Sequence, residues 1–402
     1  MAGALAVGCS LLTDLDGLSQ PSGDAGVDVV EAAPPATGFT IGVEPAHVTA
    51  DRGDSIVSVT VKANRAVGFT DPITVTFNAP PPGAGIKGVS SLTLSGTTLS
   101  GPITFAIDGN ATTGDYPIEV LGQSGTLTKP ASFGLRIDTV LFMGAKSGTI
   151  TVPSYSTALD VQAWGGGGGA GSYTGYADGG IGGAGGFSAG HLTVTPGASL
   201  DVVVATGGGA GSGHGGGGGG YSAVKTGSTY LLVAGGGGGG GQSLSTNVGQ
   251  NGAEAHGNAS AGGCSAGSGT ATAGGAGGTG SGAGTQLKGG TASGQTSPNG
   301  GVPGGGNGGS GGGGGAGYWG GGAGAACSPQ SQGGRGGGGS GYVMAGATNV
   351  VMAAGSGATA PHTGDPDYQA SGGAAAGGDG AGLNNIGTAG TGGWVVIRLP
   401  KP

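Results

Sequence analysis

The chain has 402 residues, of which 110 are Gly, 20 are Pro and only 8% are charged, with a net charge of −8. Collagen is excluded because Gly does not recur at every third position, and a simple disordered chain is disfavoured because 35% of the residues are hydrophobic. No basic stripe is present, so we expect no nucleic-acid partner. The length favours two or three domains.

The first nine residues resemble the end of a bacterial lipoprotein signal. Leu5, Ala6, Val7 and Gly8 precede Cys9, and small residues before a Cys are typical of the lipobox. The resemblance implies that Cys9 is acylated and anchors the protein to a membrane. It also implies a true start upstream, because a signal usually has about 15–30 residues. The alternative is a chance Cys in an unprocessed N-terminus. Residues 10–38 are acidic and contain Pro, which is typical of a flexible tether.

Residues 39–138 predict an Ig-like β-sandwich. Seven short segments alternate apolar and polar residues, with turn residues between them: 39–43, 55–61, 73–77, 92–94, 103–107, 116–121 and 133–137. Gly114, Tyr116, Ile118 and Val120 resemble the G-x-Y-x-I-x-V strand of bacterial Ig-like surface domains. The resemblance implies a spacer. The region contains no Cys, so apolar packing alone must hold its sheets together.

Residues 139–402 predict a second β unit interrupted by glycine. Strand-like segments lie at 149–153, 159–164, 191–194, 200–205, 221–225, 230–234, 342–344, 350–352 and 394–399. Glycine runs lie at 165–169, 215–220, 235–241, 311–315 and 336–339. Glycine lets neighbouring backbones approach closely, so extended polyglycine helices can bundle and bond their amides to neighbouring carbonyls. We therefore expect a β-sandwich with packed polyglycine helices grown from its loops.

The order of these runs and strands resembles the glycine-rich extracellular domain of the anaplastic lymphoma kinase and leukocyte tyrosine kinase receptors, over residues 140–400. The segments that carry the resemblance are 163–169, 202–209, 215–224, 231–241, 311–322 and 333–342. The resemblance implies a jelly-roll-like sandwich with packed polyglycine II helices and the binding of a protein ligand. No kinase motif is present, so kinase activity is not implied. Cys264 and Cys327 either pair as a disulfide in an exported protein or remain free thiols in separate loops.

The sequence offers few candidate sites. GxGxxG strings are expected by chance at this glycine content, and no nucleophile or acid/base constellation is evident, so we expect no enzymatic activity and no cofactor. His362, Asp365 and Asp367 fall short of the six or so oxygen ligands of a calcium site, so we expect no metal. Tyr318, Trp319 and Tyr342 either cover the core or form an aromatic contact patch.

These features favour an exported bacterial surface lipoprotein in the cell envelope, anchored in the outer membrane through Cys9 or secreted. The glycine-rich head is then an adhesion or binding module for a protein, glycan or other surface ligand. One alternative is a self-associating subunit of an extracellular filament or coat. Another is an ice-binding protein, although flat Thr-bearing repeats of fixed period are absent.

Overall fold

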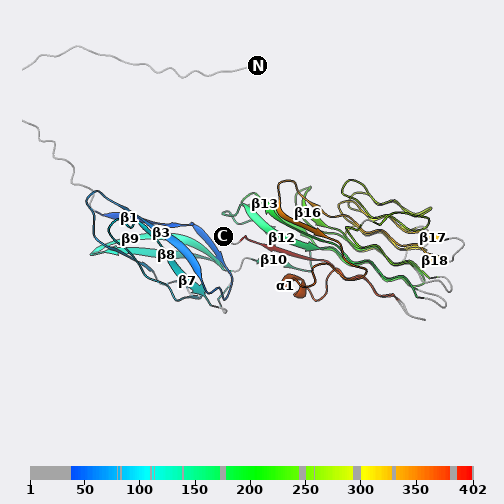
Figure 1. Cartoon of the computed structure of the whole chain (residues 1–402), viewed down its shortest axis with the longest axis horizontal. Coiled ribbons are helices and arrows are strands. Elements are labelled where there is room, and N and C mark those ends of the chain that lie inside the picture. The colour runs from blue at the N-terminus through cyan, green and yellow to red at the C-terminus, as the bar shows by residue number, and fades with distance from the viewer. Residues whose placement is uncertain are drawn as a thin grey trace, which may run out of the picture.

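The computed structural model describes residues 38–400 except 79, 82–83, 109–110, 113, 138–139, 173–177, 244–249, 258, 293–299, 328–331 and 381–386. The predicted signal, the Cys9 lipidation site and nearly all of the acidic tether lie outside the described residues. The described chain forms two β units that lie end to end along the long axis of the molecule (Figure 1). We call them the Ig-like unit, residues 39–137, and the glycine-rich unit, residues 140–399.

The Ig-like unit is a sandwich of two β-sheets in which most neighbouring strands are antiparallel. One sheet has the order β1-β3-β7-β5 and the other β2-β9-β8-β4-β6, with β2 parallel to β9. The strands are β1 (Phe39–Glu44), β2 (His47–Ala50), β3 (Val57–Arg65), β4 (Ile73–Phe77), β5 (Ile86–Lys87), β6 (Leu92–Leu94), β7 (Ser100–Ile107), β8 (Gly114–Ser124) and β9 (Leu127–Ile137).

Each of the seven strands expected from the sequence has a counterpart in this sandwich, and the short strands β2 and β5 are additional. The alternation has its usual cause, since every second residue of a strand points to the same side. Val59, Ile73 and Ile118 are fully buried between the sheets. Burying one such side chain contributes about 1.5–3 kcal/mol, so this core holds the sheets together without a disulfide.

The glycine-rich unit is a jelly-roll-like sandwich of two five-stranded sheets. Their orders are β10-β21-β12-β13-β20 and β11-β14-β15-β16-β19. The strands are β10 (Val140–Gly144), β11 (Gly148–Thr151), β12 (Ala158–Trp164), β13 (Phe187–Thr193), β14 (Ser199–Val203), β15 (Ser222–Thr226), β16 (Thr229–Ala234), β19 (Tyr342–Val343), β20 (Thr348–Ala353) and β21 (Trp394–Arg398). Leu159, Leu192, Leu232 and Ile397 are buried between these sheets.

One outer face of this sandwich is covered by the four-residue helix α1 (Pro366–Gln369). Its Tyr368 packs on Trp164 of β12, with ring centroids 5.9 Å apart, and Phe187 of β13 lies against the same indole. The indole Nε1 donates to the Pro361 carbonyl at 3.1 Å. Alternate side chains of β12 therefore pack into two apolar cores, one on each side of its sheet.

The strands run directly into a bundle of glycine segments that extends the sandwich at its far end (Figure 1). Successive amides of 165–171 donate to three different neighbours in rotation, and every third amide returns to the same neighbour. The bonds are Gly165, Gly168 and Gly171 to Gly186, Gly183 and Gly180; Gly166 and Gly169 to Gly220 and Gly217; and Gly167 and Ala170 to Thr391 and Thr388. A strand repeats every two residues, whereas this helix repeats every three. The segments are polyglycine II helices.

Packing in the bundle leaves no room for a side chain. A Cβ built on Gly239 would lie 2.0 Å from the Gly216 carbonyl oxygen, and one on Gly168 would lie 2.1 Å from that of Gly238. Ordinary contacts of this kind begin at 3.4 Å. The close approach also gives the buried backbone groups hydrogen-bond partners, because each run bonds its amides to the carbonyls of its neighbours. Glycine is thus required here by sterics.

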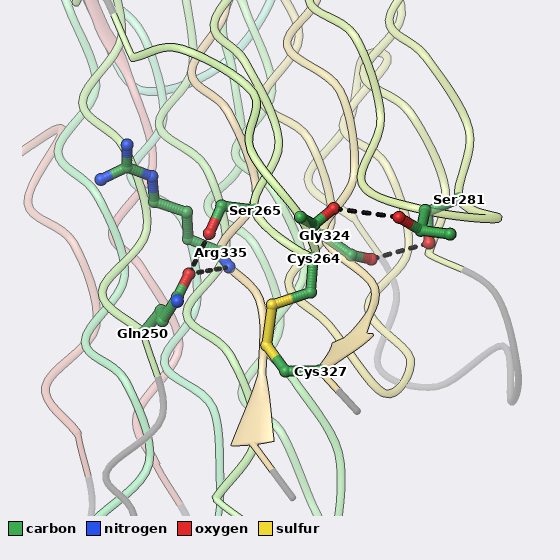
Figure 2. The surroundings of a disulfide bond; sticks show 9 residues. Gln250, Cys264, Ser265, Ser281, Gly324, Cys327 and Arg335 are labelled. Atoms are coloured by element: carbon green, nitrogen blue, oxygen red, sulfur yellow. Dashed lines mark hydrogen bonds between the residues drawn. A yellow bond between two sulfur atoms is a disulfide. The ribbon is translucent and has the colours of Figure 1, made fainter. Parts of the chain in front are cut away.

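The far end of the bundle carries a small hairpin of β17 (Ala326–Cys327) and β18 (Gln332–Gly333). A disulfide joins Cys327 of this hairpin to Cys264, 63 residues earlier in the chain, with the two Cα atoms 5.1 Å apart (Figure 2). The side-chain oxygen of Gln250 accepts bonds nearby from Ser265 Oγ and from the Arg335 amide. Of the two alternatives left open by the sequence, the structure contains the paired cysteines.

Candidate functional site

The predicted contact residues lie together on one side of the glycine-rich unit. The rings of Tyr318 and Tyr342 stack with centroids 4.1 Å apart and planes inclined by 13°. Trp319 meets Tyr318 edge-on, at 6.4 Å and 84°. All three residues are half-buried. The structure therefore combines the two interpretations, because the rings pack on one another and still reach the surface. We call these three residues the aromatic surface.

Backbone contacts with Ser340 fix the aromatic surface in place. The Tyr318 amide donates to the Ser340 carbonyl at 2.9 Å, and the Ser340 amide donates to the Trp319 carbonyl at 2.8 Å. The Trp319 amide donates to the Ser340 Oγ at 3.0 Å. Gly317 makes the approach possible, because a Cβ there would lie 2.4 Å from the Ser340 carbonyl oxygen. The rings are thus carried by the rigid bundle.

A second layer of tyrosine supports the aromatic surface from below. Tyr221 is buried beneath Tyr318 and Tyr342 in one apolar cluster, and its hydroxyl lies 3.0 Å from that of Tyr230. Burial, followed by the bond to Tyr230, raises the pKa of Tyr221 above its usual range. Its phenol therefore stays neutral at physiological pH. The surface above it offers aromatic ring faces together with the phenol hydroxyl groups of Tyr318 and Tyr342.

A cavity of about 420 Å³ lies where the two units meet, a feature that was not expected from the sequence. Tyr155, in the loop between β11 and β12, stacks on His47 of β2 at 4.4 Å. Its hydroxyl donates to Asp115 of β8 at 3.0 Å, and Arg136 of β9 pairs with the same carboxylate at 2.8 Å. Burial first and Asp115 second raise the pKa of Tyr155 to about 12.

The contacts of Tyr155 explain the cavity as a junction between units. The Asp115 carboxylate is shared between the phenol of Tyr155 in the glycine-rich unit and the guanidinium of Arg136 in the Ig-like unit. Sequence reasoning missed the arrangement because Tyr155 is a lone aromatic residue in a loop and its carboxylate partner is 40 residues away. The group clamps the glycine-rich unit to the Ig-like unit.

The acidic loop considered for a cation has structural partners instead. Asp365 caps α1 by accepting a bond from the Asp367 amide at 2.8 Å, and Asp367 pairs with Arg398 of β21. His362 packs on the ring of Phe187 at 4.2 Å. Within the described ranges, no group of three or more His, Cys, Asp or Glu side chains is placed to hold a metal ion. The side chains of Asp365 and Asp367 hold the start of α1 and its contact with β21 in place.

No helix within the described part of the chain is long and apolar enough to span a membrane. No family model and no curated protein matches the chain. A similar solved structure is the crystal structure of CBD12 from CALX1.2, with 13% identity, coverage of 40% of this chain and 71% of that chain, and a TM-score of 0.20. This likeness is too slight to assign a ligand or a function.

Proposed function

We propose that the glycine-rich unit is a non-enzymatic binding module of an exported bacterial envelope protein, held on the cell by a lipid at Cys9. The observation that carries the proposal is the aromatic surface of Tyr318, Trp319 and Tyr342 on a rigid support. Tyrosine and tryptophan are the residues most enriched among interface anchors, because they bury a large area and lose little rotamer freedom. The resemblance to the glycine-rich domain of the receptor kinases supports a ligand-binding head.

Several other features agree with this proposal. The disulfide between Cys264 and Cys327 suits an oxidising compartment outside the cytosol. The Ig-like unit, clamped through Tyr155, would act as a spacer that holds the head away from the membrane. The polyglycine bundle supplies rigidity, so binding orders few new groups and the entropic cost of contact is small.

The chemistry of the aromatic surface favours a neutral glycan as the ligand. The face of an aromatic ring is electron-rich and attracts the positively polarised C–H bonds on one face of a sugar. Phenol and indole groups at the same surface can bond to sugar hydroxyls.

The test is retention of the purified full chain on insoluble polysaccharides: cellulose, chitin and protein-free peptidoglycan sacculi. We expect wild-type protein to bind at least one of them, and Trp319→Ala to weaken that binding by roughly tenfold or more, about 1.4 kcal/mol. The matched control is Tyr116→Ala, which removes a half-buried tyrosine from the Ig-like unit. Failure of wild type to bind all three, or equal binding by Trp319→Ala, would refute the glycan proposal.

A further inference from the structure

The ring of His256 supplies a hydrogen-bond acceptor where the polyglycine bundle meets the sandwich. Every third amide of the run 235–241 donates to the segment 250–256. The bonds are Gly241 to Gln250, Gly238 to Ala253 and Gly235 to His256. In the first two the acceptor is a backbone carbonyl, whereas in the third it is the imidazole Nε2 atom, at 3.0 Å. An imidazole therefore takes the place of a carbonyl, and unlike a carbonyl it can take up a proton in mild acid.

The His256 ring is enclosed by the backbone of neighbouring segments. A Cβ on Gly186 would lie 2.6 Å from the Nε2 atom of this ring, and one on Gly341 would lie 2.5 Å from its Cε1 atom. Because Nε2 accepts a bond, the neutral ring carries its hydrogen on Nδ1, which is buried and has no hydrogen-bond partner among the described residues. His256 also has a φ of +60°, which residues other than glycine adopt at a cost. The packing of the ring outweighs that cost.

The surroundings of the ring are unsuited to a positive charge. The segments that contact His256 are 184–188, 235–241 and 339–341, and their sequences contain no ionisable side chain. The nearest ionisable residues along the chain have other partners, since Glu254 accepts a bond from the Gly357 amide at 2.7 Å and Tyr342 stacks on Tyr318. A proton on Nε2 would also set one N–H donor against another, the Gly235 amide. The protonated ring therefore cannot keep this contact.

His256 also contacts the segment that fixes the aromatic surface. Its own amide donates to the Gly339 carbonyl at 2.8 Å. Gly339 precedes Ser340, which holds the aromatic surface through its backbone and its hydroxyl. The ring lies against Gly341, which precedes Tyr342. A displacement of the His256 ring therefore acts directly on the support of the aromatic surface.

We propose that His256 is an acid-sensitive latch: protonation of its ring breaks the bond from Gly235, releases the segment 339–342 and loosens the aromatic surface. The neutral ring keeps the latch closed by accepting the Gly235 amide. In acid the charged ring leaves its backbone enclosure, and Ser340 no longer holds its partners in fixed positions. The consequence for binding, release of a ligand in acid, rests on the proposed function, whereas the latch itself does not.

The test is amide hydrogen exchange of the full chain at pH 7 and pH 4, with each rate divided by that of an unstructured chain at the same pH. Burial holds the pKa of His256 at about 4 in the closed latch, and opening restores 6.5. Acid at pH 4 should therefore favour the open form roughly a hundredfold more than pH 7 does. The amides of Gly339 and Ser340, which donate to Gly236 and Trp319, should lose protection by that factor. β8 and β9 should keep theirs.

Two substitutions assign the effect to one ring. His256→Gln keeps a side-chain oxygen that can accept the Gly235 amide but takes up no proton, so its protection should be equal at both pH values. The matched control is His191→Gln, which removes a histidine that pairs with Asp160 in the same unit and should leave the wild-type loss unchanged. Full protection of wild type at pH 4, or an equal loss in His256→Gln, would overturn the proposal.

The wild-type pH profile decides the question if His256→Gln does not fold. Uptake of a single proton predicts a loss of about tenfold per pH unit between 6.5 and 4, and a loss confined to a lower pH would contradict the latch. These rates need no ligand. Failure of the polysaccharide test would therefore leave the latch intact, and failure of the latch would leave binding at neutral pH intact.

Discussion

Replacement of one bundle glycine by alanine should destabilise the glycine-rich unit strongly. Gly239 is buried, and an added Cβ would lie 2.0 Å from the Gly216 oxygen and 2.6 Å from its carbonyl carbon. Reaching the 3.4 Å of an ordinary contact needs a displacement of more than about 1 Å. That movement would break the bonds from Gly216 to Gly240 and from Gly219 to Gly237, both 2.8 Å long.

The size of the effect follows from these two bonds. Leaving a buried backbone group unpaired costs about 1–3 kcal/mol, and overpacking adds about 1–3 kcal/mol, so Gly239→Ala should cost about 4 kcal/mol. For a unit of this size the melting temperature should fall by roughly 10 °C. The control is Gly262→Ala, where an added Cβ meets nothing within 4 Å. There the alanine only restricts the unfolded chain, and stability should change by less than about 1 kcal/mol.

Thermal unfolding followed by tryptophan fluorescence isolates the relevant unit, because Trp164, Trp319 and Trp394 all lie in the glycine-rich unit. Equal melting temperatures for Gly239→Ala and wild type would refute the steric argument. So would a Gly262→Ala variant that is as unstable as Gly239→Ala, because the loss would then come from glycine content and not from position.

Three further predictions concern other contacts. His256 accepts a bond from the Gly235 amide at 3.0 Å, and burial lowers its pKa from 6.5 to about 4. Neutral His256 therefore makes its full contribution to the free energy of unfolding above pH 6.5. This contribution, up to about 3 kcal/mol, is lost as the pH falls towards 4. The His256→Gln variant should show a flatter dependence of unfolding free energy on pH over this range. Replacing both Cys264 and Cys327 by Ser removes a 63-residue crosslink and should lower the unfolding free energy in denaturant by about 4 kcal/mol, whereas a loss under 1 kcal/mol would contradict the crosslink. Tyr155→Phe deletes the bond to Asp115, about 1 kcal/mol, and should broaden the distance distribution in small-angle scattering; an unchanged distribution would show that the clamp does not hold the junction.

The strands of both units could be predicted from the sequence wherever apolar and polar residues alternate. Val57 to Val61 in β3 and Leu159 to Trp164 in β12 are examples. β10 was missed because Val140 to Met143 is a continuous apolar run without a period, and β2 because Val48 is its one large apolar residue. The position of the bundle was also predictable, since glycine runs that adjoin strands have few other ordered states.

The neighbours within the bundle could not be predicted. Every glycine presents the same backbone, so nothing in the sequence says that Gly165 bonds to Gly186 and Gly166 to Gly220. The partners follow from which strands of the sandwich lie side by side. The same holds for the candidate site. Tyr318 and Tyr342 were singled out as aromatic residues among glycines, but their stacking depends on Ser340 bonding to the backbone of both Tyr318 and Trp319.

Amide hydrogen exchange of the full chain tests the central claim most directly, namely that the glycine runs form an ordered polyglycine bundle that supports the aromatic surface. The decisive amides are those of 215–220 and 235–241, which donate to neighbouring segments. The structure predicts exchange at least about 10³-fold slower than in an unstructured chain, since each 1.4 kcal/mol of opening free energy is a factor of ten. Exchange of these amides at the rate of free coil would contradict the bundle, and with it the rigid support for Tyr318, Trp319 and Tyr342.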